Sequence, residues 1–392
     1  MKVNSDPNEL FKKELTLVLV IIVVLTPFIF LYLKYQNQWK NSENIIDKSN
    51  VNAIEINFSD VRKMQLSNDK KYLYVYGHDR SGISIFDIHD TKNIKLLSTF
   101  LFPNIRENYV SEIDVTETKD GKKLYIVSPY LGLYCFDISD KSNLKLEKII
   151  KIKEALKISL TEDEKKAFIR SDKGMYVVDL SLESTPIIGE YISTNSIADI
   201  QANGKNSYPL DLGDIQVYDD NYVFLLDRKG LHLLDVSDLS KIKSIFDIGT
   251  LARGRQIILS PNKLHIYILA VSNNIEFFDI SDFKNIRSLG GYTSNNDFVR
   301  GLKIFDNGTK AILLGGRYNE KNRNAHFYEI EVVDISYPLD PKLIKKFKLK
   351  IKKFDKFAIS PDNKYIYINF SHENKYKHKS YVFSKEINLK KE

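Results

Sequence analysis

Short apolar segments alternate with polar turns along most of the chain, and the same arrangement returns many times. One form of the repeat reads "GLYCFDISDKSNLKL" from Gly132, which is an apolar strand, an Asp, a turn and a second strand. Similar segments begin at Gly82, Gly174, Gly230 and Asn274. Apolar residues fill nearly every position of these strands, as expected for sheets that neighbouring sheets cover on both faces. The pattern therefore predicts a repetitive all-β fold.

A second recurring segment contains an apolar strand, a turn rich in Asp, Asn and Lys, and an aromatic strand. Its turns, such as "KDGKK" and "SPDNK", are hairpin signals. The segment occurs seven times, beginning at Met64, Ile113, Leu156, Ile215, Ile257, Leu302 and Phe357. Together the two segments give four strands per unit at a spacing of roughly 40 to 56 residues, which is typical of a β-propeller blade.

The ends of the repeated region predict how the ring closes. The seventh unit has only three strands, and "NAIEINF" at residues 52–58 alternates like an outer strand that belongs to no earlier unit. We expect this segment to complete the last blade, so that no edge stays open between the first and last units. The prediction is a seven-bladed propeller with four-stranded blades over residues 51–392.

An Asp at the end of the third strand recurs in six units. These residues are Asp87, Asp137, Asp179, Asp235, Asp279 and Asp334, and the seventh, degenerate copy carries Ser384 instead. Six copies around a ring cannot converge on one substrate atom. An Asp followed by a turn can accept hydrogen bonds from backbone N–H groups of that turn. We therefore interpret the repeated Asp as a structural residue and look for function among residues that are not repeated.

The strand that carries this Asp, together with the apolar strand after it, resembles the LVIVD repeat of β-propellers on bacterial and archaeal surfaces. The most similar copies are "GMYVVDLSLESTPIIGEY" from Gly174 and "EIEVVDISYPLDPKLIKKF" from Glu329. Several copies lack the Pro that usually follows the Asp-containing strand. The resemblance covers most of residues 51–392, and it implies propeller blades and a surface or periplasmic setting but no particular reaction.

Residues 15–33 form an uncharged, mostly apolar stretch bounded by Glu14 and Lys34. A helix of this length nearly matches the hydrocarbon core of a bilayer. The stretch is longer than the apolar region of a cleaved signal peptide, and no small-residue cleavage site follows it. The sequence thus predicts one N-terminal transmembrane helix as a signal anchor, after a head of residues 1–14 and before a linker of residues 34–50.

The charges around this stretch leave its orientation nearly balanced. The flanking lysines are Lys2, Lys12 and Lys13 before it and Lys34, Lys40 and Lys48 after it. A short head before a large folded domain favours a cytoplasmic N-terminus. We expect a single-pass protein of the plasma (inner) membrane, with the propeller in the periplasm or outside the cell.

Composition narrows the function further. The formal net charge is +7 and the lysines are scattered, whereas a nucleic-acid-binding protein usually concentrates them in one patch. The single cysteine, Cys135, has no partner for a disulfide and lies within a predicted strand. No HExxH, GxSxG, P-loop or CxxC motif occurs, and the seven His are dispersed. We therefore expect no cofactor and no metal.

Three insertions interrupt the repeats, at residues 193–214, 316–328 and 371–380. The last two fall between the second and third strands of neighbouring units, so they should meet at one rim. They supply candidate binding residues, with solvated hairpin extensions as the alternative. These candidates are Arg317, Tyr318, Arg323, His326, His372 and His378.

The mouth of the central channel offers a second set of candidates. Aligning the innermost strands places five charged residues at one level, together with Ser111 and Gly213: Arg62, Glu154, Arg255, Arg300 and Asp355. Arg255 and Arg300 come from neighbouring units, and arginine is well suited to bind a carboxylate or phosphate with two hydrogen bonds. The alternative is an ordinary water-filled channel lined by charged residues.

These observations favour a membrane-anchored, extracytoplasmic propeller that binds or assembles a partner without catalysis. The expected partner is an envelope protein or a polymer. An alternative is a propeller enzyme of the lactonase or lyase type with a metal in the channel, for which only Glu154 and Asp355 would supply carboxylates at the mouth. A structural surface-layer component that associates with itself is a further alternative, and the oligomeric state stays open.

Overall fold

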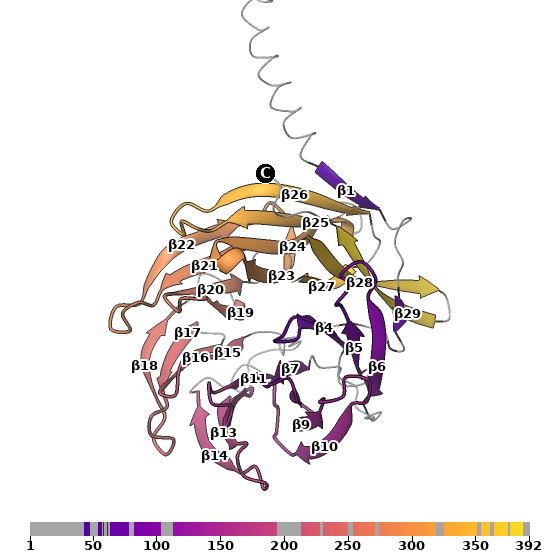
Figure 1. Cartoon of the computed structure of the whole chain (residues 1–392). Helices are drawn as coiled ribbons and strands as arrows, with labels where there is room; N and C mark the ends of the chain where they lie inside the picture. Colours follow the sequence, from indigo (N-terminus) through magenta and orange to yellow (C-terminus); the bar gives the residue numbers. More distant parts are fainter. Residues whose placement is uncertain are drawn as a thin grey trace, which may run out of the picture.

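The strands of each repeated unit pair in sequence order and form one sheet. The computed structural model describes residues 43–47, 54–56, 58, 61, 63–77, 82–102, 113–193, 213–227, 230–249, 254–270, 274–318, 325–350, 354–360, 364–374 and 377–386. Strands in these ranges fall into seven sheets, which we number as blades from the N-terminus. Figure 1 shows the sheets arranged in a ring, with first strands near the centre and outer strands at the periphery.

The first four blades have four strands each. Blade one contains β3 (Lys63–Leu66), β4 (Tyr72–Tyr76), β5 (Gly82–Asp87) and β6 (Lys95–Leu101). Blade two contains β7 (Asp114–Glu117), β8 (Lys123–Ser128), β9 (Gly132–Asp137) and β10 (Lys145–Ile150). Blade three contains β11 (Lys157–Leu160), β12 (Lys166–Arg170), β13 (Gly174–Asp179) and β14 (Ile187–Ile192). Blade four contains β15 (Asp214–Val217), β16 (Tyr222–Leu226), β17 (Leu231–Asp235) and β18 (Lys243–Ile248).

The last three blades complete the ring. Blade five contains β19 (Gly254–Leu259), β20 (His265–Ala270), β21 (Asn274–Asp279) and β22 (Arg287–Thr293). Blade six contains β23 (Phe298–Phe305), β24 (Lys310–Tyr318), β25 (Ala325–Asp334), β26 (Lys342–Lys350) and the added strand β1 (Glu43–Asp47). Blade seven contains β27 (Phe354–Ile359), β28 (Tyr365–Asn374), β29 (Lys377–Glu386) and the N-terminal strand β2 (Ile54–Ile56).

The predicted fold class is wrong in two respects. The predicted transmembrane helix at residues 15–33 lies outside the described residues, and nowhere in the described part of the chain is a helix long and apolar enough to span a membrane. The fold that the structure shows is all-β, with one short 3-10 turn at Asp306–Gly308 as the helical element of the described ranges. Blade six also has five strands where four were predicted.

The fifth strand of blade six comes from the segment predicted as a linker. β1 pairs in parallel with the outer strand β26, from Glu43 opposite Lys346 to Asp47 opposite Lys350. An outer strand has unpaired backbone groups, which an additional strand can satisfy. The register places Glu43 and Asp47, at the two ends of β1, opposite lysines of β26. The repeats gave no sign of this pairing.

The closure of the ring by an N-terminal strand is confirmed. β2 pairs antiparallel with β29, with Ile54 opposite Val382 and Ile56 opposite Ser380. Ile56 is buried in one hydrophobic cluster with Met64 of blade one and Tyr367 of blade seven. The segment therefore completes the last blade and also packs against the first one.

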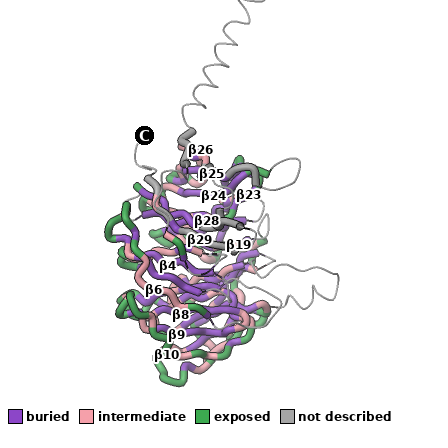
Figure 2. The backbone as a smooth tube through the Cα atoms, turned by 90° about the vertical axis from the view of Figure 1, so that its right-hand side faces the viewer, coloured by how far each residue is buried: buried purple, intermediate pink, exposed green. Residues whose placement is uncertain are grey.

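The hydrophobic core is divided among the junctions between blades. Seven clusters of buried side chains occur in the described residues, and each takes its members from two neighbouring blades. Side chains on both faces of each sheet are therefore buried, which explains the nearly continuous apolar strands in the sequence. Figure 2 shows the ring from its side, with buried strands inside and exposed residues concentrated in turns.

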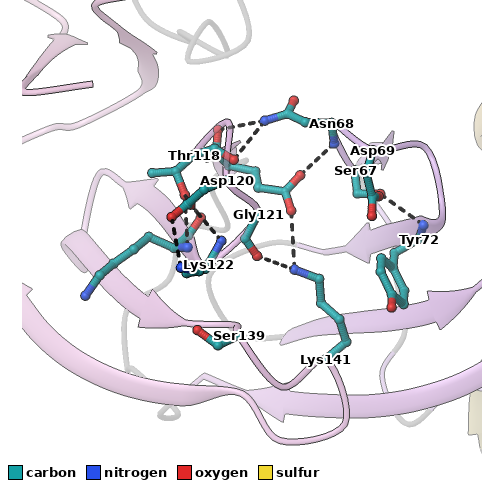
Figure 3. A network of polar contacts seen from close by, with 12 residues as sticks. Ser67, Asn68, Asp69, Tyr72, Thr118, Asp120, Gly121, Lys122, Ser139 and Lys141 are labelled. Carbon is teal, nitrogen blue, oxygen red and sulfur yellow. Dashed lines mark hydrogen bonds and ion pairs between the residues drawn. The ribbon is translucent and has the colours of Figure 1, made fainter. Parts of the chain in front are cut away.

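A buried carboxylate adds a polar link between blades one and two. Glu117 of β7 accepts hydrogen bonds from the Tyr74 hydroxyl at 2.5 Å and from the Asn68 backbone N–H at 2.8 Å. The Asn68 side chain donates to the Thr118 carbonyl at 3.0 Å, and the Lys141 ammonium donates to the Gly121 carbonyl (Figure 3). The turn of blade one is thereby bonded to the turn of blade two.

The alternating direction of the strands gives the ring two different faces. The turns between first and second strands and between third and fourth strands lie on one face, which we call the turn face. The connections between blades and those between second and third strands lie on the other face, which we call the loop face. The described ends of all three predicted insertions lie on the loop face. Two of them extend long hairpins, to Tyr318 opposite Ala325 and to Asn374 opposite Lys377.

Candidate functional site

The repeated Asp residues lie at the start of turns on the turn face. In each of the six, one carboxylate oxygen accepts a hydrogen bond from the backbone N–H two residues later, at 2.8 to 3.1 Å. At Asp137 this bond from the Ser139 N–H lowers the pKa of the carboxyl. These are the contacts that a structural turn residue requires, and they lie away from the loop face.

The loop-face mouth of the channel is charge-balanced in blades one to four. The first residue of each inner strand there alternates in sign: Lys63, Asp114, Lys157 and Asp214. Lys63 lies 2.5 Å from a carboxylate oxygen of Asp114, and the two lysines outweigh burial and lower the pKa of this carboxyl. Burial raises the pKa of Asp214, which accepts a hydrogen bond from the Ile257 N–H at 2.8 Å. These four residues thus compensate one another.

Blades five and six differ, because their inner strands contain β-bulges. The pairing of β19 with β20 shifts between Gly254 and Gln256, so Arg255 is the extra residue. The pairing of β23 with β24 shifts between Val299 and Gly301, so Arg300 is the extra residue. The inner strands of blades one to four pair without such shifts. Bulges change the direction of a side chain and often occur next to functional sites.

Arg300 is part of a cationic and aromatic cluster, which we call the blade-six platform: Arg300, Phe298 and Tyr318. The Arg300 guanidinium lies 5.3 Å from the centre of the Phe298 ring. The rings of Phe298 and Tyr318 lie 4.8 Å apart, and Tyr318 is 45% exposed. The Tyr318 N–H is held by a carboxylate oxygen of Asp297 at 2.8 Å. The structure therefore brings a predicted channel-mouth residue and a predicted rim residue to the same place, with the exposed Arg317 next to them in sequence.

Two further arginines lie near this mouth. The Nε of Arg255 is buried and has no hydrogen-bond partner among the residues that the structure describes. The Arg170 guanidinium packs over Gly213, where a Cβ would lie 2.7 Å from Nη2, and its Nε donates to the Leu226 carbonyl at 3.3 Å. The Gly213 N–H in turn donates to the Gly254 carbonyl at 2.9 Å, directly before Arg255. Arginines from blades three, five and six therefore lie at the same, loop-face end of the channel.

The sequence alignment predicted Glu154 on an inner strand, but the structure places it in a connection on the loop face. It belongs to the connection between β10 and β11 and has a φ of 57°. A hydrogen bond with the Asp172 carboxyl, together with burial and the charge of Asp172, raises the pKa of Glu154 to about 7. The Glu154 carboxyl is therefore protonated below that pH and can donate to Asp172. Within the described ranges no cluster of three or more His, Cys, Asp or Glu side chains is placed to hold a metal.

A histidine held between two carboxylates lies at the loop-face end of blade four. Nε2 of His232 is 2.9 Å from Asp227 and Nδ1 is 2.5 Å from Asp247. Burial alone would lower the pKa of His232, but its hydrogen bonds to the two carboxylates outweigh burial and raise it. The Ser193 hydroxyl also donates to Asp227 at 3.1 Å, at the point where the first insertion begins.

Several predicted site residues have no described geometry. Arg62, Ser111, Arg323 and most of the first insertion lie outside the described residues. Asp355, His326, His372 and His378 lie on the strands β27, β25, β28 and β29, and Asp355 falls within the register shift between Phe354 and Phe357. A binding role for all of these residues stays a prediction.

One blade matches the model of a known protein family. Residues 211–250, which cover all four strands of blade four, match the LVIVD repeat. The chain is therefore a β-propeller that contains an LVIVD repeat in blade four. The match falls on a different copy from the two segments that resembled the repeat most in the sequence.

Solved structures share the propeller architecture of this chain at low sequence identity. The β-propeller domain of Cps50 (Swd1) from Myceliophteria thermophila has a TM-score of 0.58 at 10% identity, over 85% of this chain and 98% of that one. Hydrazine synthase from Kuenenia stuttgartiensis has a TM-score of 0.54 at 12% identity, over 80% and 94%. A functionally unknown protein from Desulfotomaculum acetoxidans has a TM-score of 0.52 at 11% identity, over 79% and 89%. No curated protein matches the sequence. These similarities concern the fold alone.

Proposed function

We propose that this LVIVD-repeat propeller is a non-catalytic binding or assembly module that holds an anionic group of a protein or polymer partner at its loop-face mouth. The observation that carries the proposal is the blade-six platform, in which Arg300 stacks on Phe298 beside the half-exposed Tyr318. Arginine and tyrosine are the residue types that dominate recognition surfaces. An arginine stacked on an aromatic ring keeps its donors in one plane for a carboxylate or phosphate.

The distribution of charge supports an anionic partner. Lysines and aspartates compensate each other in the inner strands of blades one to four, whereas bulges add Arg255 and Arg300 in blades five and six. The buried Nε of Arg255 has no described hydrogen-bond partner, and a buried donor of this kind is stabilised when a ligand accepts from it. Placement of the propeller outside the cytoplasm depends on residues 15–33 and stays a prediction.

Crosslinking in cells tests the proposal. The double variant Arg255→Gln, Arg300→Gln should capture at least about tenfold less of the partner crosslinked by the wild type, because charge-assisted hydrogen bonds are lost. Arg287→Gln is the matched control, since this exposed arginine pairs with Asp279 at the turn-face end of blade five. Equal capture by all three proteins would show that the mouth is not the binding surface.

A further inference from the structure

A pocket of about 560 Å³ opens at the other end of the molecule, between the inner strands of blades five, six, seven and one. Its walls include Leu66, Ile258, Leu259, Ile304 and Phe305, all of which are neither fully buried nor fully exposed. The volume lies within the range of about 300 to 1,000 Å³ that is usual for small-molecule sites. The pocket belongs to the turn face and shares no residue with the blade-six platform.

The repeat is interrupted where this pocket forms. The corresponding turns of blades one, two, three and five each contain one described residue with positive φ, namely Lys70, Gly121, Glu164 and Lys263. In blade six three consecutive residues, Asp306, Asn307 and Gly308, have φ values of 52°, 53° and 87°. Gly308 approaches Pro261 of blade five so closely that a Cβ would lie 2.8 Å from the proline ring. The blade-six turn thus has a conformation of its own, and it lines the pocket.

The charges at the pocket favour an anion. Lys70 and Lys303 both line it, from blades one and six. The carboxylate of Asp306 is paired with Lys310 at 3.0 Å, so its charge is compensated within blade six. An apolar cavity with two ammonium groups suits a molecule that has an apolar body and one acidic group.

We propose that this turn-face pocket binds a small amphipathic organic acid, with its apolar body against the isoleucines, leucines and Phe305 and its carboxylate toward Lys70 and Lys303. The site is independent of the partner surface proposed above, because it lies at the opposite end of the channel. Peptide or polymer binding at this pocket is the competing outcome.

Calorimetric titration of the purified full chain tests the pocket with 1-naphthoate and its neutral analogue 1-naphthamide. We expect one naphthoate per chain and about tenfold weaker binding of the amide, because the amide lacks the charge. Lys303→Gln should reduce naphthoate affinity to the level of the amide. Ile304→Trp or Leu259→Trp should fill the pocket and weaken both compounds at least about tenfold. Lys71→Gln is the control, since Lys71 neighbours Lys70 but does not line the pocket.

Three results would overturn the inference. These are absence of saturable naphthoate binding by the wild type, equal affinity for the acid and the amide, and unchanged binding in both tryptophan variants that keep the circular dichroism spectrum of the wild type. The Arg255→Gln, Arg300→Gln variant should bind naphthoate normally. Loss of partner capture with intact naphthoate binding in this variant would show that the two sites are separate. Loss of naphthoate binding with intact partner capture in Lys303→Gln would show the same.

Discussion

Glu117 shows how a single buried side chain connects two repeats. It is 6% exposed, and it receives hydrogen bonds from a tyrosine hydroxyl and a backbone amide of the preceding blade. The carboxylate and burial together raise the pKa of Tyr74, so the tyrosine stays a donor. Removal of the carboxylate would leave the buried Tyr74 hydroxyl without its acceptor and the Lys141 ammonium, 3.4 Å from Glu117, without its counter-charge. Such losses cost more than the bonds themselves contribute.

Glu117→Ala should therefore lower the free energy of unfolding by about 3 kcal/mol, the sum expected for buried donors left without a charged acceptor. Urea unfolding of the full chain measures this. Glu162→Ala is the matched control, because the Glu162 side chain is 74% exposed, and its effect should be within about 0.5 kcal/mol. Equal effects of the two substitutions would contradict the structural role of Glu117.

His232 should make blade four sensitive to pH. Because its pKa is raised in the folded protein, its contribution to stability is complete below about pH 6.5 and is lost as pH rises through the folded pKa. Asp227 and Asp247 contact the imidazole, and the hydroxyls of Ser193 and Ser244 donate to these two carboxylates. Burial, together with the same carboxylates, raises the pKa of the neighbouring Tyr191 of blade three. The fully protonated imidazole is the form that donates to both carboxylates.

The melting temperature of His232→Gln should thus fall below that of the wild type at pH 6, and the difference should shrink by pH 9. Thermal unfolding in matched buffers measures it. Asp247→Asn removes one carboxylate and should move the transition to lower pH. A difference that is constant from pH 6 to 9 would rule out the charged histidine as its source.

Glu154 should give the loop face between blades two and three a separate pH dependence. Its pKa is raised from 4.5 to about 7, so the stability associated with its neutral form is complete below pH 4.5 and is lost as pH rises through about 7. Glu154→Gln removes the titration, and the stability of this variant should decline less than that of the wild type between pH 5 and 8. Identical pH profiles by thermal unfolding would show that the pair with Asp172 does not form in solution.

At the scale of elements, the sequence predicted strands better than it predicted the residues that line the channel. Hairpins are local, so each inner hairpin was recognisable from its turn. The alignment of inner strands nevertheless started one to three residues too early in blades one to four, which displaced Lys63, Asp114, Lys157 and Asp214 from the candidates. Since side chains alternate along a strand, a shift of one residue changes the face.

In blades five and six the alignment did select residues at the channel mouth, Arg255 and Arg300. Their strands are longer and contain bulges, which depend on pairing with the next strand and leave no mark in the hydrophobic pattern. Phe298 was missed because an aromatic residue at the start of an apolar strand is indistinguishable from core. Alternating lysine and aspartate at the first inner-strand position was the one signal in the sequence that could have identified the balanced half of the mouth.

The closing strand provides a test at this scale. Ile56→Asp places a charge in the cluster that joins blades seven and one and should destabilise the protein by about 3 to 5 kcal/mol. Glu55→Gln in the same short strand is the control, because Glu55 is exposed, and its effect should be within about 0.5 kcal/mol. Urea unfolding measures both, and comparable midpoints for the two variants would mean that β2 contributes little to closure.

At the scale of the whole molecule, the two faces differ in how regular they are. Repeated turns with bonded carboxylates make the turn face nearly uniform from blade to blade, except where blade six forms its pocket. Connections of variable length, bulged inner strands and long hairpins gather on the loop face. The repeats could predict this division because strand direction alternates, but they could not predict the chemistry of either end of the channel.

The pairing of β2 with β29 has a consequence for biosynthesis. β2 leaves the ribosome before the strands of blade one and must wait for its partner, which is translated after all the other propeller strands. Until then blade seven lacks its outer strand, and the nascent ring exposes an edge to other chains. A polypeptide that terminates before Lys377 can never close, so an incomplete product is distinguishable by its open edge from a finished one.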